Sequence, residues 1–143
     1  MSAPPFIAYS GSREYTTLSA VHSDVAALPR EAVIVVGGWW STGSVLRAYP
    51  TRGVDLAAAV AAAQDHTVVL VIGPYGAGNG AGVLRNPITV AIGDELRAFA
   101  SQCHQPGCPH RPHPTHGTER TVACARYQGK PVRLFGPDGL EIQ

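Results

Sequence analysis

The sequence predicts an α/β fold with a parallel sheet, and two observations carry that prediction. Apolar segments rich in β-branched residues alternate along the chain with segments of helical spacing or high helix propensity. The apolar segments are continuous rather than alternating with polar residues, which is typical of strands buried on both faces of a sheet. Glycine and proline cluster in loops between these segments, which indicates well-separated secondary-structure elements rather than a disordered chain.

Each expected element follows from its local pattern. Strands are expected at 6–10, 32–36, 66–72, 95–100 and 130–135. Helices are expected at 15–28, 55–64, 83–92 and 118–127, and Gly129 is expected to cap the last one. Pro87 implies that the third helix starts late or kinks. The alanine-rich helix at 55–64 is expected to pack on a flat surface such as a sheet, although it also suits a dimer seam.

Two segments fit no clean period. Residues 39–51 are expected to be an insertion that contains a turn of helix at most. It suits a lid in which Trp39 or Trp40 stacks on a base, an oligomer contact, or a cover for the edge of the core. The tail after residue 135 is expected to be a turn and a frayed end.

Composition excludes several classes of protein. The 143 residues suit one domain, and the net charge of +1 shows none of the basic excess of nucleic-acid binders. No apolar run is long enough for a transmembrane helix, and the N-terminus lacks the features of a signal peptide. Three cysteines do not make a disulfide framework. The expected protein is therefore cytoplasmic, with neither nucleic acid nor membrane as a partner.

The loops that follow the expected strands carry the first evidence of function. Residues 10–13, 37–52, 73–85 and 101–118 hold most of the glycines and the clusters of Ser, Thr, Arg and His. In a parallel sheet, ligands bind where loops leave the carboxyl ends of the strands. Glycine allows a backbone to approach phosphate closely, and helix N-termini offer N–H groups to it.

Four motifs in these loops together resemble a known family. They are SGSREY at 10–15, VVGG at 35–38 continued by RGVDLAAA at 52–59, GAGVLRN at 80–86, and THGTERTVACARYQGKPV at 115–132. Their order resembles the SLOG superfamily, which includes the Lonely Guy enzymes, and most closely its small uncharacterised single-domain branch. The resemblance covers about residues 6–135. It implies a Rossmann-like three-layer sandwich with about five parallel strands, and a homo-oligomer.

The resemblance also implies that the chain binds or senses a nucleotide or a nucleotide-derived molecule, including ADP-ribose-like ligands. It assigns the ligand-binding positions motif by motif: Gly11, Ser12 and Arg13; Gly37, Gly38 and Asp55; Arg85 and Asn86; Thr115, His116, Gly117 and Thr118. Physical chemistry supports a phosphate-bearing ligand at these positions. A Gly-Thr at the start of a helix presents backbone N–H groups to phosphate, and the planar guanidinium group of arginine matches the geometry of phosphate.

An alternative is an enzyme that cleaves or transfers at the N-glycosidic bond of nucleoside monophosphates. Glu119 or Asp55 would be its acid or base. Lonely Guy enzymes have paired glutamates after the Gly-Thr, whereas this chain has Arg120 and Thr121 there. Glu119, one position away on the helix, points in another direction. The substitution favours binding over hydrolysis.

A cysteine- and histidine-rich loop occupies 101–117. Cys103 and Cys108 lie close in sequence to His104, His110, His113 and His116. Zinc prefers thiolate and imidazole ligands, so Cys103, Cys108 and His113 are candidates for a structural site, with His116 assigned to phosphate instead. The other interpretation is a proline-stiffened loop with exposed histidines and reduced thiols. A zinc-stabilised interaction protein without a ligand is therefore a third hypothesis for the whole chain.

Overall fold

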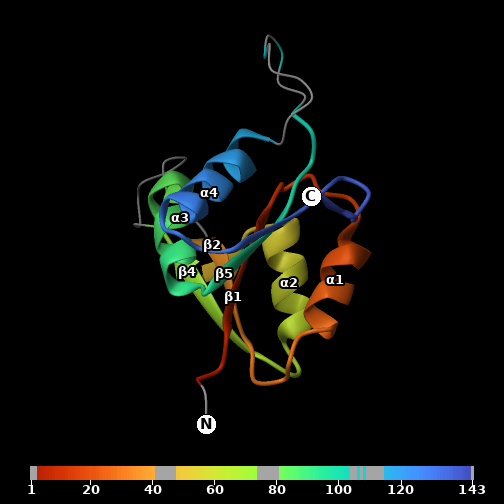
Figure 1. Cartoon of the computed structure of the whole chain (residues 1–143), viewed down its shortest axis with the longest axis vertical. Coiled ribbons are helices and arrows are strands. Elements are labelled where there is room, and N and C mark those ends of the chain that lie inside the picture. The colour runs from red at the N-terminus through yellow and green to blue at the C-terminus, as the bar shows by residue number, and fades with distance from the viewer. Residues whose placement is uncertain are drawn as a thin grey trace.

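The computed structural model describes residues 3–40, 48–73, 81–103, 106, 108 and 115–142 (Figure 1). Within these ranges the chain alternates strands and helices, so the predicted α/β class is confirmed. None of the described helices has the length and apolar character that crossing a bilayer requires.

Five parallel strands form the centre of the sheet, as the sequence predicts. They are β1 (Phe6–Gly11), β2 (Val33–Trp40), β4 (Thr67–Ile72), β5 (Glu95–Phe99) and β6 (Val132–Phe135). Parallel pairing runs in the order β4-β2-β1-β5-β6. The chain therefore builds the sheet outward from β1 in one direction and then returns to add β5 on the other side of β1.

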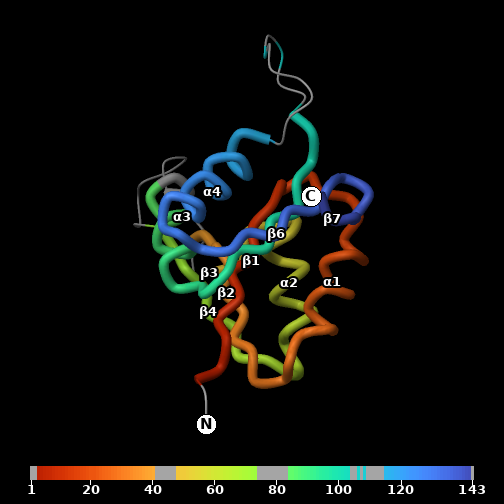
Figure 2. The backbone as a smooth tube through the Cα atoms, viewed as in Figure 1, coloured from red at the N-terminus to blue at the C-terminus, as the bar shows by residue number. Residues whose placement is uncertain are grey.

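Two short antiparallel strands extend the sheet and correct the sequence prediction. β3 (Ala48–Pro50) pairs with the end of β2, so both described ends of the 39–51 insertion are strands, and a turn of helix between them would lie outside the described residues. β7 (Glu141–Ile142) pairs with β6, so the tail is a strand at the sheet edge rather than a frayed end (Figure 2). The sheet is consequently mixed and has seven strands.

Helices cover both faces of the sheet. They are α1 (Leu18–Ala26), α2 (Val54–Ala62), α3 (Ala81–Ile92) and α4 (His116–Tyr127). Figure 1 shows α1 beside α2 on one side of the strands and α3 beside α4 on the other. α3 begins at Ala81, before the expected start at 83, and continues through Pro87, so the predicted late start is wrong. α4 begins at His116, two residues before the predicted start, and Gly129 follows it with φ of +73°, as expected of a capping glycine.

Strand alternation divides the core into two halves. Ile7, Tyr9 and Ile34 point to the face covered by α1 and α2, where the buried alanines of α2 let that helix approach closely. Ala8 and Val35 point to the opposite face, covered by α3 and α4. The prediction that the alanine-rich helix packs on the sheet is thus confirmed. Burial on both faces explains why the strands are continuously apolar.

Candidate functional site

A cavity of about 640 Å³ opens at the carboxyl ends of β1, β5 and β6. β1 and β5 are the neighbours between which the order of the strands reverses, the place where open α/β sheets bind ligands. Its walls come from four separate segments: Ser12, Glu14 and Thr16 after β1, Ser101 and Gln102 after β5, Thr115 before α4, and Pro137 after β6. The volume lies within the usual range of small-molecule pockets.

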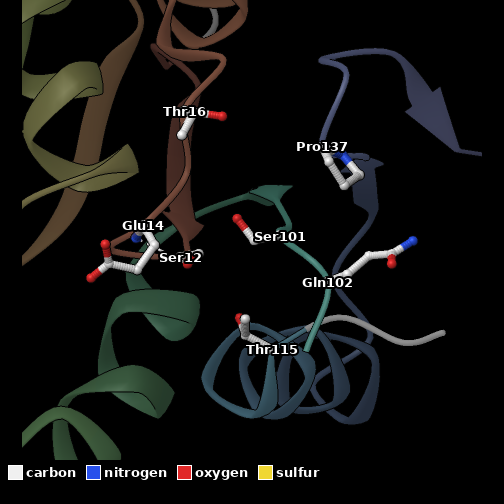
Figure 3. Close-up of a pocket in the computed structure, with 7 residues that line it drawn as sticks. All are labelled: Ser12, Glu14, Thr16, Ser101, Gln102, Thr115 and Pro137. Atoms are coloured by element: carbon white, nitrogen blue, oxygen red, sulfur yellow. Dashed lines mark hydrogen bonds between the residues drawn. The ribbon is translucent and has the colours of Figure 1, made fainter. Parts of the chain in front are cut away.

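Four of the seven residues that line this cavity carry a hydroxyl group. In Figure 3, Ser101 lies in the middle, with Ser12 and Pro137 on opposite sides of it and Thr115 below. Backbone hydrogen bonds hold these walls together, because Ser12 N donates to Phe99 O at 3.4 Å and Thr115 N donates to Ser101 O at 3.0 Å. A cavity lined in this way offers hydrogen bonds to sugar hydroxyls and phosphate oxygens.

The N-terminus of α4 meets the cavity at Thr115. This residue is the N-cap, but its side chain makes no capping hydrogen bond. Its Oγ1 instead lies 3.1 Å from Thr118 Oγ1. The first N–H groups of a helix have no partner within the helix, and they carry the positive end of its dipole. An anionic group in the cavity would therefore be stabilised on this side.

Arg85 forms a second cluster beside the cavity. Its Nη1 donates to Gly38 O at 2.8 Å and to Thr51 Oγ1 at 3.1 Å, while its Nη2 donates to Asn86 Oδ1 at 3.5 Å. Its Nε is buried and has no hydrogen-bond partner within the described chain. The guanidinium group thus fixes the end of β2 against α3.

Glycine allows two close contacts in this region. A Cβ at Gly37 would lie 2.6 Å from Arg85 Nε, so only glycine lets the guanidinium rest on β2. Gly53 has φ of +88°, and a Cβ there would lie 2.5 Å from Ser12 O and 2.8 Å from Arg13 Cα. Gly53 therefore brings the start of α2 against the loop after β1.

Asp55 is the most perturbed acid of this cluster. It lies in the first turn of α2, only 7% exposed, and its Oδ1 has no hydrogen-bond partner among the described residues. Burial raises the pKa of Asp55 to about 7, although the charges of Arg85 and Arg13 oppose that rise. Burial likewise lowers the pKa of Arg85, and the charge of Asp55 opposes this. The site thus holds a carboxyl that changes charge near neutral pH.

A third cluster joins sulfur and imidazole groups. His116 Nε2 lies 3.7 Å from Cys103 Sγ and 3.7 Å from Cys108 Sγ. All three ligand atoms lie within 4.8 Å of one another, so these residues could hold a metal ion. Cys103 is buried, and the other two residues are half-buried. Cys124 lies elsewhere on α4, where it accepts a hydrogen bond from Gln128 Nε2.

The structure brings many of the predicted residues together, but in separate clusters. Ser12 and Thr115 line the cavity. A second cluster forms around the guanidinium group of Arg85 and consists of Gly37, Gly38, Asp55 and Asn86. Arg13 is exposed at the edge of that group, and Gly11 packs against Phe99 and Val54. Gly117 and Thr118 lie in the first turn of α4.

Three predicted residues have a different outcome. His116 was assigned to phosphate, but it lies against the two cysteines. His113, the predicted zinc ligand, is outside the described residues. Glu119 is exposed on α4 and, like Asp55, is not among the residues that line the cavity.

Sequence reasoning did not single out several residues of the cavity wall. Ser101 and Gln102 follow directly after the fourth expected strand, so their position at a strand end was the available signal. Pro137 follows the fifth strand in the same way, but it belongs to the segment that was expected to fray. Thr51, which binds Arg85, lies in the insertion and had no recognisable pattern.

Comparison of the chain with protein-family models, curated proteins and solved structures gave no match.

Proposed function

We propose that this protein binds a nucleotide or a nucleotide-derived small molecule, of the ADP-ribose type, at the carboxyl edge of its sheet. The observation that carries the proposal is the cavity of about 640 Å³ where the strand order reverses, which has four hydroxyl-bearing residues and the N-cap of α4 in its wall. Such a cavity suits a ligand that combines hydroxyl groups with negative charge.

Different residues of the cavity wall suit different chemical groups of the ligand. Phosphate oxygens would lie near Thr115, where they accept hydrogen bonds from the first N–H groups of α4 and interact with its dipole. Ribose hydroxyls would pair with Ser12, Ser101 and Gln102. Arg13, exposed on the loop after β1, would add positive charge at the edge of the cavity. The guanidinium group of Arg85 would hold the end of β2 against α3 rather than touch the ligand.

The strand order supports the same assignment. The order β4-β2-β1-β5-β6 corresponds to the 3-2-1-4-5 order of doubly wound nucleotide-binding sheets. The proposal therefore includes a Rossmann-like architecture and a relationship to the SLOG superfamily.

Hydrolysis of an N-glycosidic bond is the second candidate. It is favoured by Asp55, since a carboxyl with a pKa of about 7 suits an acid or base at neutral pH. Asp55 is buried beside Arg85, however, and does not line the cavity. Contact with a reacting bond would therefore require α2 or the loop after β1 to move. Binding without turnover is the better proposal.

Isothermal titration calorimetry with ADP-ribose, AMP and inorganic phosphate tests the proposal. Ser101→Leu fills the cavity with an apolar side chain and should weaken nucleotide binding by at least about tenfold, which corresponds to 1.4 kcal/mol. Ser23→Leu, on the exposed face of α1, is the matched control and should bind normally. Equal affinity in both variants, or no binding to the wild type, contradicts the proposal. Release of free base from AMP would support the hydrolase instead.

A further inference from the structure

The cluster of Cys103, Cys108 and His116 has the dimensions of a metal site. In a tetrahedral zinc site, bonds of about 2.3 Å to sulfur and about 2.0 Å to nitrogen place neighbouring ligand atoms roughly 3.5–3.8 Å apart. Both sulfur atoms lie 3.7 Å from the same nitrogen, His116 Nε2. These two distances match two edges of such a tetrahedron, and all three ligand atoms lie within 4.8 Å of one another.

Hydrogen bonding alone explains this arrangement less well. A neutral imidazole nitrogen has either one lone pair or one hydrogen, so Nε2 makes one good hydrogen bond to a thiol and not two. A cation on the far side of the three atoms accepts an electron pair from each of them. The two cysteines and the histidine converge on one point, which a shared cation accounts for directly.

The chemistry of the ligands selects the ion. Thiolate and imidazole favour zinc and its neighbours over magnesium or calcium, which prefer oxygen. Two thiolates balance the charge of a divalent cation, so the centre is neutral and suits a half-buried position. Each thiol loses its proton when the ion binds, so two protons are released.

We propose that Cys103, Cys108 and His116 bind a zinc ion that holds the segment after β5 against the first turn of α4. The fourth position of the tetrahedron is left to water or a further donor. Two ligands directly follow residues of the cavity wall, since Cys103 comes after Gln102 and His116 after Thr115. The ion therefore fixes two walls of the cavity relative to each other. This proposal stands whether or not the cavity binds a nucleotide.

Metal analysis of the intact, reduced protein tests it. Native mass spectrometry should show one zinc ion per chain, and cobalt in its place should give the visible absorption of a tetrahedral thiolate site. Cys108→Ser and His116→Ala should each weaken zinc binding by more than about 100-fold, the upper end of the loss caused by removing an outer-shell partner. Both positions are half-buried, and circular dichroism checks that the variants fold.

The controls use the same residue types outside the cluster. Cys124→Ser lies on the same helix as His116, and His22→Ala lies on the exposed face of α1; both should bind zinc as the wild type does. Zinc binding that is unchanged in His116→Ala overturns the proposal. So does a wild type that binds no zinc or cobalt when reduced, or that contains a Cys103–Cys108 disulfide instead.

Discussion

Arg85 and Gly37 show at the scale of single residues how the sequence motifs serve one structure. The guanidinium group rests where a side chain on Gly37 would be, and it bonds to Gly38 O and Thr51 Oγ1. The Gly-Gly of one motif and the arginine of another are therefore two halves of the same contact.

Gly37→Ala should destabilise the protein. The added Cβ would lie 2.6 Å from Arg85 Nε, so the guanidinium must move away from its hydrogen-bond acceptors. We expect the free energy of unfolding to fall by about 1–3 kcal/mol, measured by urea denaturation. Gly117→Ala is the control, because nothing lies within 4 Å of its Cβ position in α4. A similar loss in both variants would refute the contact.

Asp55 should make stability depend on pH. The folded chain raises the pKa of this carboxyl from its ordinary 3.8 to about 7, so it retains a proton that the unfolded chain releases. The free energy of unfolding should therefore fall as pH rises between these values, by about 1 kcal/mol per pH unit, and the contribution should level off above pH 7.

Thermal unfolding of Asp55→Asn measures this effect, because the amide cannot ionise beside Arg85 and Arg13. Subtracting the free energy of unfolding of the variant from that of the wild type at each pH removes the contribution of other titrating groups. The difference should grow from pH 4 to pH 7 in the direction of a less stable wild type. A difference that is independent of pH would show that Asp55 is ionised throughout this range.

The resemblance singles out the motif residues around Arg85 as ligand-binding positions, but their contact with one another depends on the fold and was not predicted. Ser101 and Pro137 were not singled out, because serine and proline are common in all loops and only the fold places them in one cavity. The contact of His116 with both cysteines likewise depends on where α4 starts.

At the scale of elements, a buried ion pair fastens α1 to the sheet. Arg97 of β5 donates to both carboxylate oxygens of Asp24, at 3.0 and 2.9 Å, and the two side chains are each 11% exposed. Tyr9 of β1 also donates its hydroxyl to Asp24. Burial and the charge of Asp24 raise the pKa of Tyr9, which keeps that hydroxyl protonated.

Asp24→Asn should cost about 1–3 kcal/mol, because Arg97 loses one of its two carboxylate partners and keeps the other, Glu95 at 3.3 Å. Asp65→Asn removes the exposed pair with Arg30, whose side chains are 85% and 53% exposed, and should change stability by less than about 1 kcal/mol. Guanidinium denaturation compares the two variants. If they are equally stable, α1 is held by apolar packing and not by this pair.

The sequence predicted the five parallel strands and four helices because each has a pattern of its own over several residues. β3 and β7 were missed because strands of three and two residues carry no period, and their pairing is decided by the neighbouring strand. The early start of α4 was missed because Gly117 suggested a turn, whereas the structure places it inside the helix.

At the scale of the whole molecule, self-association remains a prediction. Leu84, Ile88 and Ile92 are exposed at helical spacing along α3, an arrangement that suits contact with another apolar surface. The alanines of α2, by contrast, are used by the core, so that helix is less available for a dimer seam than the sequence alone suggests.

Zinc at the Cys103, Cys108 and His116 cluster should also stabilise the whole molecule against heat. If zinc fixes the segment after β5 against α4, a chelator should lower the melting temperature of the wild type by several degrees, since each 1 kcal/mol of lost stability lowers it by about 4 °C in a domain of this size. The His116→Ala variant should not respond. Equal responses would mean that the chelator acts elsewhere.

Native mass spectrometry of the wild type and Ser101→Leu with added ADP-ribose tests the central claim most directly. We expect one ligand per chain on the wild type and a marked loss of that complex in the variant, because its new side chain occupies the cavity. A wild type that stays free of ligand, or a variant that binds ADP-ribose equally well, would contradict the assignment of a nucleotide to this cavity.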